Sequence, residues 1–277
     1  MLLGNEPVLE PQARLYQRLL AGDPDEATDH AEEFLKQGYL IDFYDKIGIP
    51  ALLIGERDRQ RGVMLDEQRV RFAESTQALV ANLREIAEEE ENEEQAAEKD
   101  DADNPSRPDK QQGDLPDGEG RSLICIGGRG EIDDAAAAML AQVFEVQGAA
   151  ASVAGHPMLE AARIRELALK DVDAAVVLYL NGQSSAHARH AVRRLKRLRR
   201  GLRVGILIPQ IDAEAAAGSA IAWAEINADF IVSSIADAVV AGLQDTPPVP
   251  LKAAPRRLLR SRSGVRSEAT PAPALGP

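Results

Sequence analysis

The 277-residue sequence is poor in cysteine, histidine and aromatic residues. The single cysteine, Cys125, excludes a disulfide within the chain and is typical of a reducing compartment. Aromatic residues make up only 4% of the chain, so leucine, valine, isoleucine and alanine must build its cores. No apolar run reaches the roughly 18 residues that cross a bilayer. The amino terminus has acids and prolines where a signal peptide needs basic and then apolar residues. We therefore expect a cytoplasmic protein, with peripheral attachment to the inner membrane left open.

The net charge of −13 argues against a general nucleic-acid binder, but the charge is unevenly distributed. Residues 85–103 contain 11 acids and one lysine. Like charges repel and extend a chain, and prolines and glycines follow, so residues 99–120 are predicted to form a disordered acidic linker. Residues 247–277 are rich in proline, alanine, serine and arginine, which predicts a disordered basic tail.

Before the linker, apolar residues recur at helical spacing in four segments joined by short turns, which predicts a four-helix bundle over residues 1–98. Asp23 is placed to cap the second helix, with Pro24 at its first position and Gly22 ending the helix before it. Pro50 is expected to kink or break the third helix.

After the linker, short apolar segments alternate with amphipathic ones, which predicts a flavodoxin-like, doubly wound, five-stranded parallel sheet over residues 121–246. The predicted strands are 123–126, 150–153, 174–180, 204–208 and 230–232. The predicted helices are 131–147, 158–170, 184–200, 213–227 and 235–244.

In such a sheet, ligands bind beyond the carboxyl ends of the strands. The candidate crevice positions are Gly128, Glu131, Asp133, Asn181 and Gln210. The turn at 128–130 resembles a dinucleotide fingerprint, but Asp133 stands where a small third residue is needed. The carboxylates of Glu131, Asp133 and Asp134 would repel a phosphate and instead favour the helix dipole. A divalent metal held by these three acids is the less favoured alternative.

No catalytic set is evident elsewhere. A phosphoacceptor receiver domain is excluded because the third strand ends without an aspartate and the fifth without a lysine. Ser184 and Ser185 lack the G-x-S-x-G pattern and are expected to cap the following helix. His187 and His190 are expected on the surface, and His156 is expected to stand alone. The chain is therefore predicted not to be an enzyme, with catalysis by Ser184 or the acidic cluster as the least favoured alternative.

The helix after Ser184 carries seven basic residues between positions 189 and 200 and no acid. Arg193, Arg194, Arg197 and Arg200 are candidates for docking to an anionic lipid surface or a partner. Solvated arginines and binding of the acidic linker are the alternatives. Nucleic acid is disfavoured because no aromatic residues are interleaved for base stacking.

The order of a helical region and a flavodoxin-like unit resembles the cobalamin-binding module of corrinoid proteins. The resemblance lies in residues 19–27, 43–56 and 226–229. That family has Asp-x-His-x-x-Gly after the first strand, and its histidine ligates cobalt. Here residues 131–136 are EIDDAA, with Asp133 at the histidine position. Residues 179–181 and 209–210 also replace the family's Ser-x-Leu and Gly-Gly, which implies a retained fold without its cobalamin chemistry.

The sequence also resembles the cytosolic carboxyl-terminal region of bacterial permeases of the autoinducer-2 exporter family. The matching segments are residues 2–9, 16–20, 44–45 and 50–52. This resemblance implies a non-enzymatic regulatory or partner-binding module associated with a membrane transporter and lacking a cofactor. The alternative is a small-molecule sensor that binds cobalamin without a protein histidine, or another ligand, in the crevice.

Overall fold

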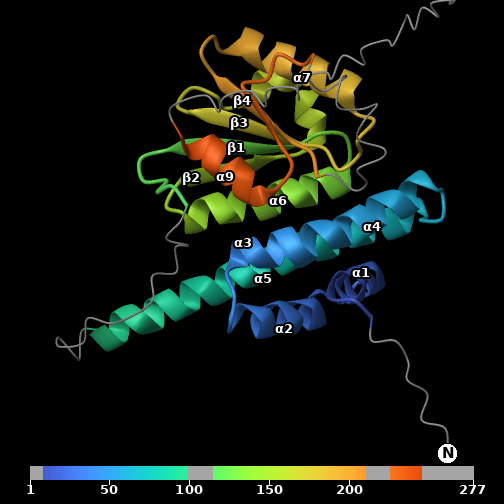
Figure 1. The fold of residues 1–277 in the computed structure, drawn as a ribbon, viewed down its shortest axis with the longest axis vertical. Helices are drawn as coiled ribbons and strands as arrows, with labels where there is room; N and C mark the ends of the chain where they lie inside the picture. The colour runs from blue at the N-terminus through green and yellow to red at the C-terminus, as the bar shows by residue number, and fades with distance from the viewer. Residues whose placement is uncertain (1–8, 99–114, 210–224, 245–277) are drawn as a thin grey trace, which may run out of the picture.

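The computed structural model describes residues 9–98, 115–209 and 225–244. Figure 1 shows stacked layers, with α7 on one face of the sheet and α6 and α9 on the other. The helices of the amino-terminal half lie beyond α6. The predicted helix 213–227, the predicted tail and most of the predicted linker, residues 99–114, lie outside the described residues.

The amino-terminal half is helical, as predicted. Its elements are α1 (Pro11–Ala21), α2 (Pro24–Leu35), α3 (Leu40–Phe43), the π-helix η1 (Tyr44–Gly48), α4 (Ile49–Gln60) and α5 (Asp66–Glu98). Gly22 ends α1 in the left-handed conformation, with φ of 83°. The Asp23 side chain accepts a hydrogen bond from the amide of Glu26 at 3.2 Å, which confirms the predicted cap of α2.

The predicted third helix runs through Pro50, but with a change of pitch. The π-helix Tyr44–Gly48 separates α3 from α4, and Pro50 lies in the first turn of α4. Proline has no amide hydrogen to donate to a preceding carbonyl, so the wider π turn precedes it instead of a break. This π-helix contacts both α6, through Tyr44, and α9, through Asp45.

The second half contains the predicted sheet of five parallel strands. They are β1 (Ser122–Gly127), β2 (Ala150–Ala154), β3 (Ala174–Leu178), β4 (Arg203–Leu207) and β5 (Phe230–Val232), in the order β2-β1-β3-β4-β5. The described covering helices are α6 (Glu131–Val146), α7 (Ser185–Leu198) and α9 (Ile235–Leu243). The parallel pairing and this strand order confirm the flavodoxin-like prediction.

The helix predicted over residues 158–170 is wrong. The structure has only the 3₁₀-helices η2 (His156–Leu159) and η3 (Ile164–Glu166), joined by turns. Two arginines of the α7 segment bond carbonyls in this stretch: Arg194 bonds that of Leu159 at 2.8 Å, and Arg199 bonds that of Leu169 at 2.8 Å. These tertiary bonds satisfy backbone groups that a helix would have satisfied locally.

Alternate residues of the central strands face different layers. In β1, Leu123 and Cys125 belong to the cluster on the α6 side, whereas Ile124 and Ile126 belong to the cluster on the α7 side. The α6-side cluster continues without interruption into the helical half and includes Phe43, Tyr44 and Phe72 among its fully buried rings. The predicted bundle and sheet units therefore share one apolar core.

Polar contacts join the same two halves. The buried Tyr44 hydroxyl donates to the side-chain oxygen of Gln142 on α6. The Asp45 carboxylate accepts the amides of Ile235 and Ala236 at 2.7 and 3.0 Å, which caps the start of α9. Residues 115–120, assigned to the linker from sequence, also contact this layer, because the Gly118 amide donates to the Gln147 carbonyl at 2.7 Å.

Replacing Asp45 with alanine should destabilise the whole chain by about 1–3 kcal/mol, because two amides at the start of α9 lose their acceptor. Urea unfolding followed by circular dichroism measures this loss. Asp42→Ala is the matched control one turn earlier, because its ion pair with Lys46 is on the surface and should contribute less than about 0.5 kcal/mol. Equal losses in the two variants would contradict the role of Asp45.

Candidate functional site

The candidate site lies at the carboxyl ends of β1 and β3, where the strand order reverses. Gly128 is buried in the turn between β1 and α6. A Cβ atom at Gly128 would lie 2.3 Å from the Tyr179 ring and 2.4 Å from the Leu178 carbonyl oxygen. Glycine is therefore required here so that the turn can pack against the end of β3, and its role is structural.

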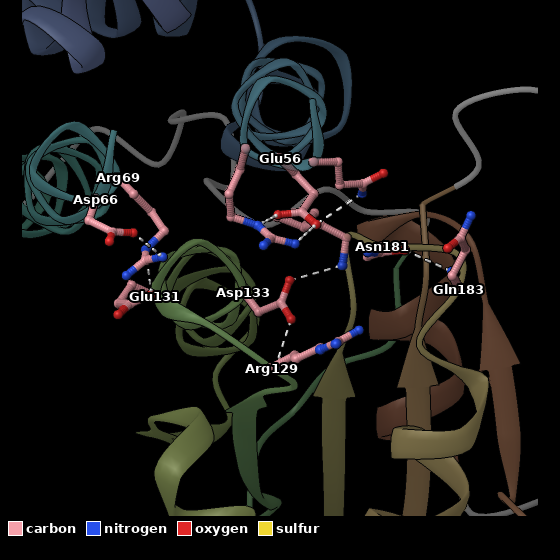
Figure 2. Close-up of polar contacts among 11 residues, drawn as sticks. Glu56, Asp66, Arg69, Arg129, Glu131, Asp133, Asn181 and Gln183 are labelled. Carbon is pink, nitrogen blue, oxygen red and sulfur yellow. Dashed lines mark hydrogen bonds and ion pairs between the residues drawn. The ribbon is translucent and has the colours of Figure 1, made fainter. Parts of the chain in front are cut away.

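Asp133, in the first turn of α6, is 5% exposed. Its two carboxylate oxygens accept the Arg129 amide at 2.9 Å and the Leu180 amide at 3.0 Å. Figure 2 shows this carboxylate between the β1–α6 turn and the residues that follow β3. One side chain thus ties together the two loops that border the crevice.

The electrostatic environment of Asp133 disfavours its ionised form. Burial raises the pKa of its carboxyl to about 7, and the negative charge of Glu56 adds to the increase. The two backbone amides act in the opposite direction and lower the pKa. The result is a buried carboxyl whose charge changes near neutral pH.

Asp134 joins α6 to the segment after β2, a contact that the sequence did not predict. Its carboxylate accepts the His156 amide at 2.6 Å and lies 2.8 Å from Nδ1 of the same histidine. The prediction that His156 stands alone is therefore wrong. Burial raises the pKa of Asp134, and its bonds to His156 oppose that shift. No local pattern could show this pair, because 22 positions separate its members.

Helix α4 contributes a charged group above the same edge of the sheet. Glu56, 4% exposed, binds Arg59 at 2.6 and 2.7 Å and Gln60 at 3.0 Å. Figure 2 shows Glu56 above Asp133 and Asn181. Sequence reasoning missed Glu56 and Arg59 as site residues, and the only signal was their three-residue spacing on one helix.

A small cavity of about 90 Å³ remains between α4 and the strand ends. It is lined by Glu56, Arg59, Arg69, Arg129, Gly130, Glu131, Ile132, Asp133 and Asn181. Three predicted crevice residues, Glu131, Asp133 and Asn181, therefore line one cavity, and Gly128 lies in the turn beside it. Gln210 lies outside the described residues.

The three acids proposed as a metal site are not arranged as ligands. Glu131 pairs with Arg69 at 3.1 Å, while Asp133 bonds backbone amides and Asp134 bonds His156. Within the described ranges, no group of three histidine, cysteine or acidic side chains is placed to hold a metal ion. The helix-dipole interpretation of these acids agrees with their place in the first turn of α6.

Ser184 occupies the expected position at the start of α7 but does not cap it with its side chain. Its φ and ψ of −84° and 11° are close to helical, whereas a capping serine normally adopts an extended conformation. The residue is 1% exposed, and its hydroxyl has no hydrogen-bond partner among the described residues. The predicted capping by Ser184 is therefore wrong.

The basic residues of α7 divide into two groups. Arg194 binds the Leu159 carbonyl, and Lys196 pairs with Asp229 at 2.9 Å. In contrast, Arg193, Arg197 and Arg200 are exposed, and none of them pairs with a residue in the described ranges. Of the four predicted docking arginines, three point to solvent and Arg194 is used within the fold.

Comparisons with known proteins give a weak structural similarity. No family model matches the chain, and no curated protein matches it. A crystal structure of a cobalamin-binding protein from Desulfitobacterium hafniense DCB-2 is similar at 12% sequence identity and a TM-score of 0.32. The alignment covers 84% of this chain and 96% of that chain. Among the helices in the described ranges, none is sufficiently long and apolar to span a bilayer.

Gly128→Ala should destabilise the protein by about 2 kcal/mol or more, because the added methyl group overlaps Tyr179 and the Leu178 carbonyl. Gly182→Ala, in the loop after β3, is the control, since a Cβ there meets nothing within 4 Å, and should change stability by less than about 0.5 kcal/mol. Thermal and urea unfolding measure both changes. Similar stability of the two variants would show that the turn is not closely packed.

Asp133→Asn should alter how stability depends on pH. The pKa of Asp133 is about 7 in the folded state and 3.8 in its ordinary range, so the folded state binds the proton more tightly than the unfolded state. The stability gained from this proton is therefore complete below about pH 4 and is lost as pH rises through about 7. The stability of the wild type relative to Asp133→Asn should therefore fall by about 2 kcal/mol between about pH 5 and about pH 8.

Urea unfolding of both proteins at the two pH values measures this difference. Glu67→Gln, which removes an exposed carboxylate at the start of α5, controls for the loss of one acid. A stability difference between wild type and Asp133→Asn that stays constant or grows with pH would contradict the assignment.

Proposed function

We propose that this chain is a non-enzymatic regulatory or partner-binding module in which helix α4 and its charged side chains close the ligand edge of a flavodoxin-like sheet. The observation that carries the proposal is the position of Asp133. Its carboxylate is used by the backbone amides of Arg129 and Leu180, so it serves the fold instead of facing a ligand.

The sequence resemblance suggests cobalamin as a cofactor, but the residues at the site do not fit it. The position of the expected cobalt-ligating histidine is Asp133, which is buried and bonded to backbone amides. The cavity of about 90 Å³ is well below the roughly 300 Å³ of small-molecule pockets, and a corrin would have to displace Glu56 and Arg59. These observations support a fold that no longer carries a corrin.

The proposed lack of catalysis rests on the groups that line the edge. Ser184 is buried, and the acids beside the cavity are engaged by Arg69, by backbone amides or by His156. A nucleophile needs a base within hydrogen-bond reach and access to a substrate. The proposed partner class is a membrane transporter, and the support for it is the sequence resemblance to the cytosolic regions of exporter-family permeases.

A sensor of an anionic small molecule is the second candidate, favoured by the start of α7. Unlike α6, the first turn of α7 has no acid, and no side chain in the described part of the chain caps it. The exposed Arg129 lies near it: burial lowers the pKa of His187, and the charge of Arg129 lowers it further. Helix amides together with an arginine form an environment that suits a phosphate or carboxylate.

A thermal-shift comparison with hydroxocobalamin, nucleotides, inorganic phosphate and divalent metals tests the proposal. A partner-binding module should show no shift with any of these compounds, and hydroxocobalamin should not remain with the protein through gel filtration. A sensor should be stabilised by about 2.7 kcal/mol when its ligand is present at about 100 times its Kd. Stoichiometric retention of a corrin spectrum would overturn the proposal, and a shift with phosphate compounds would favour the sensor.

A further inference from the structure

Two exposed histidines and three exposed arginines follow one another along α7 and the turn after it. His187, His190, Arg193 and Arg197 follow one another at intervals of three or four positions, and Arg200 lies in the turn after the helix. Residues at these spacings share one helix face. We call Arg193, Arg197 and Arg200 the α7 arginine stripe. No ion pair with another described residue neutralises it.

The fold itself accounts for the other cations of this segment. Arg189 pairs with Glu225 at 3.1 Å, and Lys196 pairs with Asp229. Arg194 and Arg199 bond carbonyls of the segment that replaces a helix between β2 and β3. Of the seven basic residues between positions 189 and 200, the three arginines of the stripe have no such contact with a described residue. The fold of the described residues therefore does not explain why they are basic.

Negative charge gathers at the other end of the molecule. A groove of about 290 Å³ between α2 and α5 is lined by Asp25, Asp29, Glu85 and Glu89. Figure 1 shows α7 at the top and α2 at the bottom, with the sheet, α6 and α5 between them. Within the described residues, the α7 arginine stripe and this acidic groove therefore lie at opposite ends.

We propose that the α7 arginine stripe docks onto an anionic membrane surface, with the acidic groove between α2 and α5 facing away. Counterions screen charges beyond about 8–10 Å at physiological salt, so a planar surface is affected mainly by the cations that face it. The distant acids then do not cancel the attraction. The inference goes beyond the proposed function and does not depend on the state of the crevice.

A lipid surface fits the stripe better than a nucleic acid does. Leu198 lies next to Arg197 and is 39% exposed, although most large apolar residues of this unit are buried. An aliphatic side chain among arginines gains free energy at the boundary between headgroups and acyl chains but gains nothing from phosphates alone. No phenylalanine, tyrosine or tryptophan lies on α7 to stack with bases.

Co-sedimentation of the full chain with vesicles tests the inference. The vesicles are phosphatidylcholine alone or phosphatidylcholine with phosphatidylserine, and a duplex DNA is assayed in parallel. The test variant is Arg193→Glu/Arg197→Glu/Arg200→Glu. The matched control is Arg57→Glu/Arg61→Glu/Arg71→Glu, which reverses three exposed arginines in the helical half and changes the net charge equally. Residues 245–277, with six further cations, are the same in every protein.

The wild type and the control should bind the phosphatidylserine vesicles, and binding should weaken as salt rises. The stripe variant should bind about 100-fold more weakly or worse, and Leu198→Ala should weaken vesicle binding without changing DNA binding. Circular dichroism melting confirms that the variants are folded. The inference is overturned if phosphatidylserine does not increase vesicle binding by the wild type, or if the stripe variant binds vesicles as tightly as the control does. It is also overturned if the wild type binds DNA more tightly than vesicles through the stripe.

Discussion

The arrangement at the strand ends depends on one buried carboxylate. Asp133 accepts amides from the turn before α6 and from the residues after β3, and these two loops form the walls of the place where flavodoxin-like sheets bind ligands. A carboxylate that is 5% exposed is stable only while such donors compensate for its lost hydration. The hydrogen bonds from the Arg129 and Leu180 amides to this carboxylate therefore also hold the two loops close together.

The helical half completes this arrangement by sharing a core with the sheet. The apolar cluster passes from β1 through α6 to the rings of Phe43, Tyr44 and Phe72 without a polar boundary. Asp45 and Tyr44 add hydrogen bonds at the same contact, and Glu56 lies above the strand ends. The helices therefore behave as a layer of the α/β fold, and moving them away from the crevice would expose apolar surface.

Charge is distributed differently inside and outside this fold. Inside, Asp133 and Asp134 bond amides or a histidine of other segments, whereas Glu56 bonds Arg59 of its own helix. Outside, three arginines of α7 without an ion pair to a described residue lie on one surface, and four acids line the groove between α2 and α5. Interior charges are tied to the fold because burying them without a partner is costly. Surface charges carry no such requirement, so the polarity of the surface is free to serve an interaction.

The sequence by itself determined the helical first half, the order of the five strands and the parallel sheet, because apolar periodicity and continuous buried strands are local properties. It also located Asp23 as a cap, and Glu131, Asp133 and Asn181 at one edge of the sheet. Only the tertiary structure decided what those residues do. The bonds of Asp133 to Leu180 and of Asp134 to His156 join residues 47 and 22 positions apart. Likewise, which arginines of α7 remain free depended on carbonyls in a segment that the local pattern had predicted to be helical. Such pairings are set by packing, and no periodicity in the chain encodes them.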